Sequence, residues 1–513
     1  MAGEICNLND MVMQELQQGN PLSSSSLPER VLQFGEGNFL RGFIDWMINE
    51  MNKSGQFNGK VVALQPTPRG RVVPKLNNQD GLYTLVLRGI DQGVKTEKIE
   101  VIHSIHRGIN PYSDWDEVLK IAESPSIEFV FSNTTEAGLQ YMEEEYEEGK
   151  SPLSFPAKLV ALLYHRYKYF RGDSNKGWII LPCELVEKNG EVLENICKRI
   201  VENWQLPVSF WEWVESSSVF CQTLVDRIVT GYPHEEADLF EARLGYKDEL
   251  LTVAEPYHLF VIEGPKDLEE KLPFKKAGLN VHFSDITSYR ELKVKFLNAP
   301  HTMLSLVGMN LGIETVKEGV EDHDFSAFLR NALTLELKET LRNDEKQSSG
   351  DYLVTVFDRF LNPYLDHRLF DISLNSYAKF QSRILPSLLK YKQLNGIYPK
   401  RLVFSLAALI TFYKVTAEDG DRKFGQGVRG QYEIRDSIEV IDRFSSFWSR
   451  YDGHEESTVQ LVKKKILKDL LPLESSNDAD NLAEEVSAYL IVIQNKGLRQ
   501  ALKLVDDQDE KGM

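Results

Sequence analysis

The chain has 513 residues and a formal net charge of −18, and its length predicts two or three domains. The acidic balance argues against nucleic acid or an anionic membrane as a partner, and any anionic substrate would need a local positive pocket. The four cysteines have no zinc-site spacing, which fits free thiols in a reducing cytosol. No signal-like start and no run of about twenty apolar residues occurs, so we expect a cytoplasmic protein without a membrane span.

A strand, a glycine turn and a helix follow one another early in the chain. Residues 30–34 have the pattern of a short buried strand, residues 35–42 form the turn, and apolar residues recur at helical spacing over 40–51. This order is typical of a dinucleotide-binding βαβ unit, in which glycines let a pyrophosphate approach the helix N-terminus. Leu40 stands where the third glycine of G-x-G-x-x-G would be, so a tight turn without a ligand remains the alternative.

The end of the second predicted strand bears on the choice of cofactor. That strand covers residues 61–64, and an NAD site usually has an acidic residue near its end to bind the ribose hydroxyls. Here Gln65 takes that place, with Arg69 and Arg71 close behind. The sequence alone therefore leaves NAD and NADP open.

The rest of the chain divides near residue 286. Residues 82–87 and 94–105 indicate an antiparallel excursion, and strand-like runs at 127–131, 178–181 and 258–262 alternate with helical patterns, as in an α/β layer fold. Amphipathic helices dominate afterwards: 323–343, 351–361, 376–393, 400–415 and 484–504. We therefore expect a Rossmann-like α/β domain over residues 1–286 and a mainly α-helical domain over 287–513.

Small polar residues follow the strand that ends at residue 131. Asn133, Thr134, Thr135 and Glu136 would lie at the carboxyl end of a parallel strand, where an open α/β sheet places its ligand contacts. Thr135 and Glu136 also suit a helix start, so an ordinary helix cap is an equal alternative.

Residues 293–301 combine a lysine, an amide and an imidazole. Lys293 could transfer a proton, Asn298 could donate to an oxyanion, and His301 could orient either group. On a continuous helix the three would fall within an arc of roughly 140°. Pro300 favours instead a helix that starts here with Asn298 as N-cap, with Lys293 on the segment leading in. A solvated helix face is the alternative without function.

Several motifs together resemble a known family. Gly-x-Gly-x-Phe-x-Arg at 35–41, the loop 183–190, Val-Asp-Arg-Ile at 225–228, and Lys-x4-Asn-x2-His at 293–301 resemble the polyol-specific long-chain dehydrogenases, the mannitol dehydrogenase family. Residues 34–41, 132–138 and 224–233 resemble in particular the members that reduce D-tagaturonate to D-altronate in hexuronate catabolism. The resemblance implies an NAD-dependent, metal-independent oxidoreductase that acts on a sugar acid.

The resemblance also assigns roles to individual residues. Lys293 is implied as the acid/base, Asn298 as an oxyanion donor and His301 as the orienting residue. Polyol-oxidising members have a second oxyanion asparagine early in the loop 183–190, where this chain has Leu185, so Asn189 is only a candidate. The turn residues implied to bind the cofactor are Phe34, Gly35, Glu36, Gly37, Asn38, Phe39 and Arg41.

The implied substrate contacts are Asp226 and Lys379. An arginine that the family has eight residues before Lys379 is Asp371 here, which leaves the cation for a substrate carboxylate open. Lys379 is the first choice, and Arg368 and Arg383 are alternates. Fructuronate reductase and mannitol dehydrogenase activity are rival expectations, and a non-catalytic nucleotide-binding regulator is a more remote one. Nothing in the sequence predicts the oligomeric state.

Overall fold

The computed structural model describes residues 6–9, 11–13, 27–470 and 476–510. They divide into two units. The first comprises Met1–Gly89 and Lys95–Thr287, and the second comprises Ile90–Val94 and Ser288–Met513. No helix in the described ranges is both long enough and apolar enough to cross a membrane.

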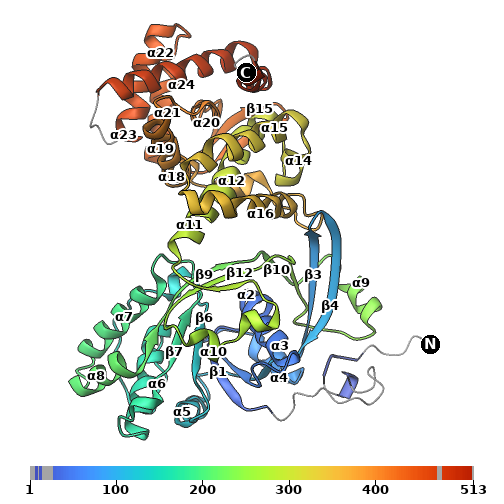
Figure 1. The fold of residues 1–513 in the computed structure, drawn as a ribbon, viewed down its shortest axis with the longest axis vertical. Helices are drawn as coiled ribbons and strands as arrows, with labels where there is room; N and C mark the ends of the chain where they lie inside the picture. Colours follow the sequence, from blue (N-terminus) through green and yellow to red (C-terminus); the bar gives the residue numbers. More distant parts are fainter. Residues whose placement is uncertain (1–5, 10, 14–26, 471–475, 511–513) are drawn as a thin grey trace. The chain divides into compact units, whose positions relative to one another are not determined.

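A six-stranded parallel sheet forms the centre of the first unit (Figure 1). Numbered along the chain, its strands have the spatial order 3-2-1-4-5-6, which is the dinucleotide-binding arrangement. The expected Rossmann-type fold is thereby confirmed. Across the sheet the strands are β5 (Ile105–Ile109), β2 (Lys60–Leu64), β1 (Glu29–Phe34), β6 (Phe129–Ser132), β7 (Ile179–Pro182) and β8 (Val219–Phe220).

Strands β1 and β6 lie at the point where the strand order reverses. Phe34, the last residue of β1, is in register with Leu64 of β2 and with Ser132 of β6. The segments that leave β1 and β6 therefore start side by side, at the place where open α/β sheets bind their ligands. Val31 and Leu32 belong to the cores on opposite faces of the sheet, which explains the continuous apolar runs of its strands.

Helices cover both faces of this sheet (Figure 1). One core includes the continuous helix made of α2 (Asn38–Leu40), the π-helical turn η1 (Arg41–Asp45) and α3 (Trp46–Lys53). The core on the other face includes α5 (Trp115–Glu123), α6 (Phe155–Tyr169), α7 (Asn189–Asn203) and α8 (Val208–Ser217).

Two smaller sheets complete the first unit. The expected excursion forms β3 (Tyr83–Asp91) and β4 (Val94–Ile102), joined by a tight turn in which Gln92 and Gly93 both have positive φ. The end of this hairpin, Ile90–Val94, is counted with the second unit. Their sheet also contains β10 (Val229–Gly231) and β11 (Thr252–Ala254). The other sheet contains β9 (Gln222–Asp226), β12 (Leu259–Glu263) and β13 (Val281–Phe283).

The second unit is mainly helical, as expected, and it also holds a small antiparallel sheet that the sequence did not predict. Its strands are β14 (Ala417–Asp419), β15 (Arg422–Gly427) and β16 (Gly430–Ile434). The stretch expected as one helix over 484–504 is divided at Gly497, whose φ is +81°. The helices include α15 (His323–Asn331), α16 (Asn343–Phe360), α18 (Ser376–Arg383), α19 (Leu385–Asn395), α20 (Lys400–Phe412), α24 (Ser476–Lys496) and α25 (Leu498–Glu510).

Candidate active site

The two glycines after β1 face different surroundings. Gly35 has a φ of +114°, and a Cβ at this position would lie 3.0 Å from the carbonyl oxygen of Asn133. Gly37 has no atom within 4 Å of where its Cβ would be. The turn is therefore closed against β6 at Gly35 and open at Gly37, where a pyrophosphate could approach the helix that begins at Asn38.

Arg41 holds this turn from inside the protein. Its guanidinium is buried and donates to the Glu36 carbonyl, to Asn38 Oδ1 at 2.6 Å and to Thr252 Oγ1 at 3.3 Å. The positive charge of Arg41 therefore organises the backbone of the turn.

The two aromatic residues of the implied cofactor-binding set pack beside the turn. Phe34 is buried, with its ring centroid 4.8 Å from that of Phe155. Phe39 stacks on Phe43 at a centroid separation of 5.0 Å. Phe34 thus anchors the end of β1, and Phe39 packs in the first turn of the helix that follows.

The carboxyl group of Glu36 is buried in the turn, and its Oε2 atom has no hydrogen-bond partner. Burial raises the pKa of Glu36 to about 7 against the opposing charge of Arg41. Burial also raises the pKa of Asp45 to about 7, although Gln33 Nε2 donates to its carboxylate at 3.2 Å. Two carboxyl groups near the turn therefore titrate close to neutral pH.

A carboxylate that the sequence reasoning missed organises the segment after β6. Glu184, just beyond β7, accepts hydrogen bonds from Ser132 Oγ at 2.9 Å, from the Thr134 N–H at 2.9 Å and from Thr134 Oγ1 at 3.1 Å. Asn133 Nδ2 donates to the Cys183 carbonyl at 2.7 Å. The available signal was a carboxylate shortly after the strand expected at residues 178–181.

Thr135 and Glu136 directly follow Thr134, the last residue that is hydrogen-bonded to Glu184. Thr135 has a φ of +72°, which is rare for a β-branched residue. It precedes a single 3₁₀ turn, Glu136–Gly138, without a capping hydrogen bond from its side chain, and Glu136 is exposed. Strain of this kind concentrates at functional sites, where it positions backbone groups.

The end of β2 presents an amide instead of a carboxylate. Gln65 is buried, and its Nε2 donates to the Thr67 carbonyl at 2.7 Å. Arg69 and Arg71 are exposed on the following segment. The structure therefore adds no acidic partner for a ribose at this position.

Asn189, the candidate for a second oxyanion donor, is the first residue of α7 and is buried. Its Nδ2 donates to the Pro182 carbonyl at 2.9 Å and to Thr223 Oγ1 at 3.0 Å, and also contacts the carbonyls of Glu184 and Thr223. Its Oδ1 accepts from the N–H groups of Gly190 and Thr223. Since all its groups are satisfied inside the first unit, Asn189 is not used in the mechanism proposed below.

Asp226 is the last residue of β9 and lies opposite Leu259 of β12. It is buried, and the guanidinium of the next residue, Arg227, stacks on Trp46 at 4.1 Å from the ring centroid. The segment is thus a fixed part of the first unit, and a contact between Asp226 and a substrate stays a prediction.

The structure corrects the expected helix start in the second unit. Asn298 is helical and makes no capping hydrogen bond, so it is not an N-cap. The N–H of Ala299 donates to the carbonyl of Val294, five residues back, and the wide turn accommodates Pro300 inside a helix. The continuous helix comprises α11 (Thr287–Lys293), η5 (Val294–Asn298), α12 (Ala299–Met303), η6 (Leu304–Gly308) and α13 (Met309–Leu311).

Two lysines on this helix have different surroundings. Lys295 is buried, forms an ion pair with Glu291 and donates to the Thr340 carbonyl at 2.9 Å. Lys293 is half-buried and lies outside this ion pair. Lys295 is therefore committed to the packing of the helix, and the acid/base role implied for Lys293 stays a prediction.

His301 has a buried nitrogen without a hydrogen-bond partner. The residue is 9 % exposed, and the centroid of its ring lies 4.7 Å from that of Phe360 and 4.8 Å from that of His367. No hydrogen bond reaches its Nε2 atom. Burial lowers the pKa of His301 well below its ordinary value, and the nearby positive groups act the same way: His367, Arg359, Arg383 and Lys379. A neutral imidazole with an unused polar atom is a position for a ligand to bind.

Asn298 lies one turn before His301 and is half-buried. Its carbonyl accepts from Thr302 Oγ1 at 3.1 Å, and Thr302 Oγ1 accepts from Arg383 Nη1 at 3.3 Å. Its side-chain amide makes no hydrogen bond to the described residues. Asn298 thus has an unused donor beside the unused nitrogen of His301.

The three cations considered for a substrate carboxylate differ in their surroundings. Lys379 is half-buried on α18, one turn before Arg383, and both groups lower the pKa of His301. Arg368 has a side chain that is 65 % exposed and bonds to Asp366 at 3.1 Å. Lys379 and Arg383 therefore lie near His301, whereas Arg368 is paired at the surface.

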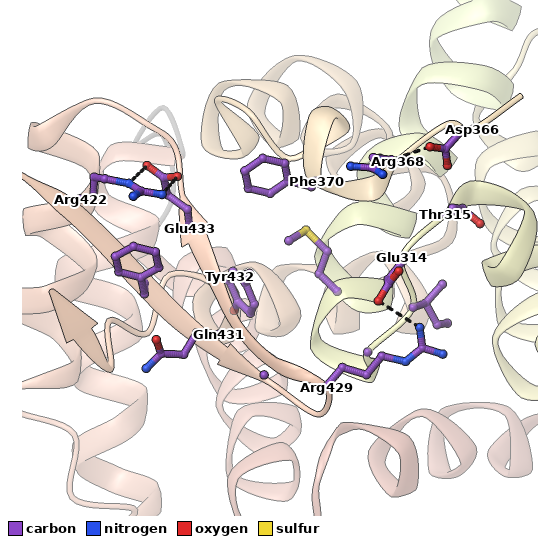
Figure 2. Close-up of a pocket in the computed structure, with 15 residues that line it drawn as sticks. Glu314, Thr315, Asp366, Arg368, Phe370, Arg422, Arg429, Gln431, Tyr432 and Glu433 are labelled. Carbon is purple, nitrogen blue, oxygen red and sulfur yellow. Dashed lines mark hydrogen bonds and ion pairs between the residues drawn. The ribbon is translucent and has the colours of Figure 1, made fainter. Parts of the chain in front are cut away.

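A cavity of about 500 Å³ in the second unit is lined by Arg368 but not by Lys379, Arg383 or His301 (Figure 2). Its three arginines are each bonded to a carboxylate: Arg422 to Glu433, Arg429 to Glu314 and Arg368 to Asp366. None of the residues with implied catalytic roles lines it. Each of its arginines therefore already has a carboxylate partner in the structure.

Within the described ranges, no group of three or more His, Cys, Asp or Glu side chains could hold a metal ion. Cys183, Cys197 and Cys221 are buried free thiols, and Cys6 is an exposed one. Burial raises the pKa of Cys221 to about 12.

Comparison with solved structures shows the same fold. A substrate-free D-sorbitol dehydrogenase matches with a TM-score of 0.76 and 21% sequence identity, over 94% of this chain and 96% of that one. Mannitol 2-dehydrogenase from Pseudomonas fluorescens, solved with NAD and D-mannitol, matches with a TM-score of 0.65 and 19% identity, over 98% and 99% of the two chains.

Comparison of sequences identifies the family. An altronate oxidoreductase of Halalkalibacterium halodurans is 47% identical over 94% of either chain. One of Klebsiella pneumoniae is 42% identical over 93% of this chain and 96% of its own. The profile of the mannitol dehydrogenase Rossmann domain matches residues 29–276, and that of the mannitol dehydrogenase C-terminal domain matches residues 285–487. The chain therefore belongs to the mannitol dehydrogenase family and is a dehydrogenase that acts on a CH–OH group.

Proposed function

We propose that this protein reduces D-tagaturonate to D-altronate with NADH. The observation that carries the proposal is the environment of His301, a buried imidazole with an unused nitrogen among positive side chains in an acidic chain. An anionic sugar would be attracted there, and a neutral one would have no charge to pair. The similar altronate oxidoreductases act on such a sugar acid by name.

The open glycine turn supports a dinucleotide in the first unit. Gly37 leaves room beside the start of the helix, and the strained segment Thr135–Glu136 lies at the adjacent strand end. Asn38 belongs to the same helix start. Arg41 and Asn133 hold these segments in place through hydrogen bonds to Asn38 and to the Cys183 carbonyl. NADH, when bound, supplies the hydride.

The helix in the second unit supplies the acid and the oxyanion donor. As hydride reaches the keto carbon, negative charge develops on the carbonyl oxygen, and the Asn298 amide donates a hydrogen bond to it. Lys293 transfers its proton to this oxygen, which completes the hydroxyl group of the product. His301, neutral at working pH, accepts a hydrogen bond at Nε2 from the sugar and fixes its orientation.

The proposal is tested by following NADH absorbance with purified protein and D-tagaturonate in the presence of EDTA. Parallel reactions contain D-fructuronate, D-fructose, or NADPH in place of NADH. We expect rapid oxidation of NADH by D-tagaturonate that EDTA leaves unchanged, because a lysine and not a metal would polarise the carbonyl. Turnover only with D-fructuronate or D-fructose would overturn the proposed substrate, and NADH binding without turnover would support the regulator instead.

A further inference from the structure

Arg383 is a half-buried cation without a carboxylate partner in the described part of the chain. Its Nη1 donates a hydrogen bond of 3.3 Å to Oγ1 of Thr302, the residue after His301. Burial is also the cause that lowers its pKa, with no acidic group offsetting it. Partial burial of a guanidinium without a counter-charge costs free energy, which an anionic ligand would recover.

The nearby carboxylates are already engaged with other groups. Asp436 accepts a hydrogen bond from the Tyr413 hydroxyl, and Asp371 lies 3.9 Å from the Arg435 guanidinium. Lys379, on the same face of α18, donates from Nζ to the Ile372 carbonyl at 2.7 Å. Of the two α18 cations near His301, Arg383 thus presents a planar fork whose other nitrogens can bind a carboxylate in two places, whereas the Arg359 guanidinium is buried.

The position of Arg383 also fits the length of the substrate. Thr302 Oγ1 accepts from Arg383 and donates to the carbonyl of Asn298, so the guanidinium lies one helical turn along from the proposed oxyanion donor. A keto-hexuronate carries its carboxylate and its keto group near opposite ends. With the keto oxygen at Asn298, the carboxylate end would extend past His301 toward Arg383.

We propose that Arg383 is the specificity-determining residue that binds the substrate carboxylate. This inference rests on the proposed function and deepens it, because it concerns how the same site selects an acid over a neutral sugar. Lys379 then assists as a neighbouring charge, and Arg368 has no part in recognition.

The test compares D-tagaturonate with D-tagatose, which has a hydroxymethyl group in place of the carboxylate. Arg383→Gln should raise KM for D-tagaturonate roughly 10- to 100-fold, the value of a charge-assisted hydrogen bond. Its kcat/KM for D-tagatose should equal that of wild type, and Arg383→Lys should give an intermediate KM. Arg368→Gln serves as the matched control and should behave as wild type with both sugars.

Several results would overturn the inference. Equal losses on both sugars would show that Arg383 only supports the helix. A normal KM for D-tagaturonate in Arg383→Gln would show that another cation binds the carboxylate. Loss of the preference for D-tagaturonate over D-tagatose in Lys379→Met alone would show the same. If wild type reduces D-fructuronate and not D-tagaturonate, the proposed substrate is wrong, and the same variants then test Arg383 on D-fructuronate.

Discussion

The loop Cys183–Gly190 and the helix Thr287–Leu311 each carry an asparagine expected to bind an oxyanion. In the loop, Asn189 donates and accepts hydrogen bonds with both its side-chain atoms inside the protein. On the helix, the Asn298 side chain makes no hydrogen bond to the described residues, and Nε2 of the neighbouring His301 is also without one. The difference teaches that the hydrogen bonds of Asn189 serve the frame of the first unit, whereas Asn298 and His301 keep polar atoms that a ligand could use.

The two lysines of the helix give the largest expected contrast. Lys293→Ala should lower kcat by roughly 10²–10⁴-fold, because it removes the proton donor, and should leave NADH binding nearly intact. Lys295→Ala should instead lower the free energy of unfolding by about 1–3 kcal/mol, since it removes the donor to the buried Thr340 and leaves Glu291 with only Lys390, 3.8 Å away. Steady-state kinetics and urea unfolding of both variants check this.

A Lys293→Ala enzyme that keeps more than about a tenth of the wild-type rate would rule out the proton-transfer role. NADH affinity, measured by fluorescence titration, is the control for an intact first unit.

The two asparagines provide the next contrast. Asn298→Ala should lower kcat by roughly 10²–10³-fold with little change in stability, because its donor is needed at the charged carbonyl oxygen. Asn189→Ala should instead leave kcat nearly unchanged and lower the stability. The loss should be about 1–3 kcal/mol for each buried group that is left without a partner. If Asn189→Ala lost activity at full stability, the loop would contribute to the oxyanion site after all.

The sequence predicted the central parallel sheet better than the small antiparallel sheet of the second unit. The strands of the central sheet are buried on both faces, so their apolar runs are visible without any partner being known. Strands β14–β16 were not predicted because charged residues, glycines and glutamines leave only a few apolar residues in them. Pairing of the kind seen between Arg422 and Glu433 stabilises them across the sheet.

The site was predictable only as far as it is local in sequence. Lys293, Asn298 and His301 follow one another within a single helix, and their spacing could be read directly. The π-helical turn that accommodates Pro300 leaves no such pattern, so a helix start was expected there. The positive groups around His301 come from other segments of the chain, and only folding brings them together.

The glycine turn offers a smaller contrast of the same kind, between a residue that faces protein and one that faces open space. Gly35→Ala should cost about 1–3 kcal/mol of stability, because its φ of +114° and the Asn133 carbonyl leave no place for a methyl group. Gly37→Ala should be neutral or slightly stabilising, since its φ of −71° suits alanine.

Gly37→Ala should nevertheless weaken NADH binding roughly tenfold, because the methyl group would occupy the space assigned to the pyrophosphate. Thermal unfolding and NADH titration separate the two effects. Unchanged NADH binding in Gly37→Ala would favour a tight turn without a ligand.

The smallest effect concerns the cost of holding His301 neutral inside the protein. Its pKa is lowered by burial and by nearby positive groups, so below the ordinary value of 6.5 the unfolded chain binds a proton that the folded protein does not. Stability is therefore retained above pH 6.5 and lost as the pH falls, by up to about 1.4 kcal/mol per pH unit. His301→Gln, which cannot be protonated, should show a shallower loss between pH 7 and pH 5 in urea unfolding.

The pH dependence of stability must be compared between wild type and His301→Gln, because other buried groups change the stability in the opposite direction as the pH falls. The pKa values of Glu36 and Asp45 are raised to about 7, so these carboxyl groups bind protons more tightly in the folded protein and favour folding as the pH falls. Both contributions are the same in wild type and in His301→Gln and cancel in the difference. Parallel stability curves for the two proteins would mean that His301 is hydrated or paired in solution, and its unused nitrogen would no longer mark the substrate site.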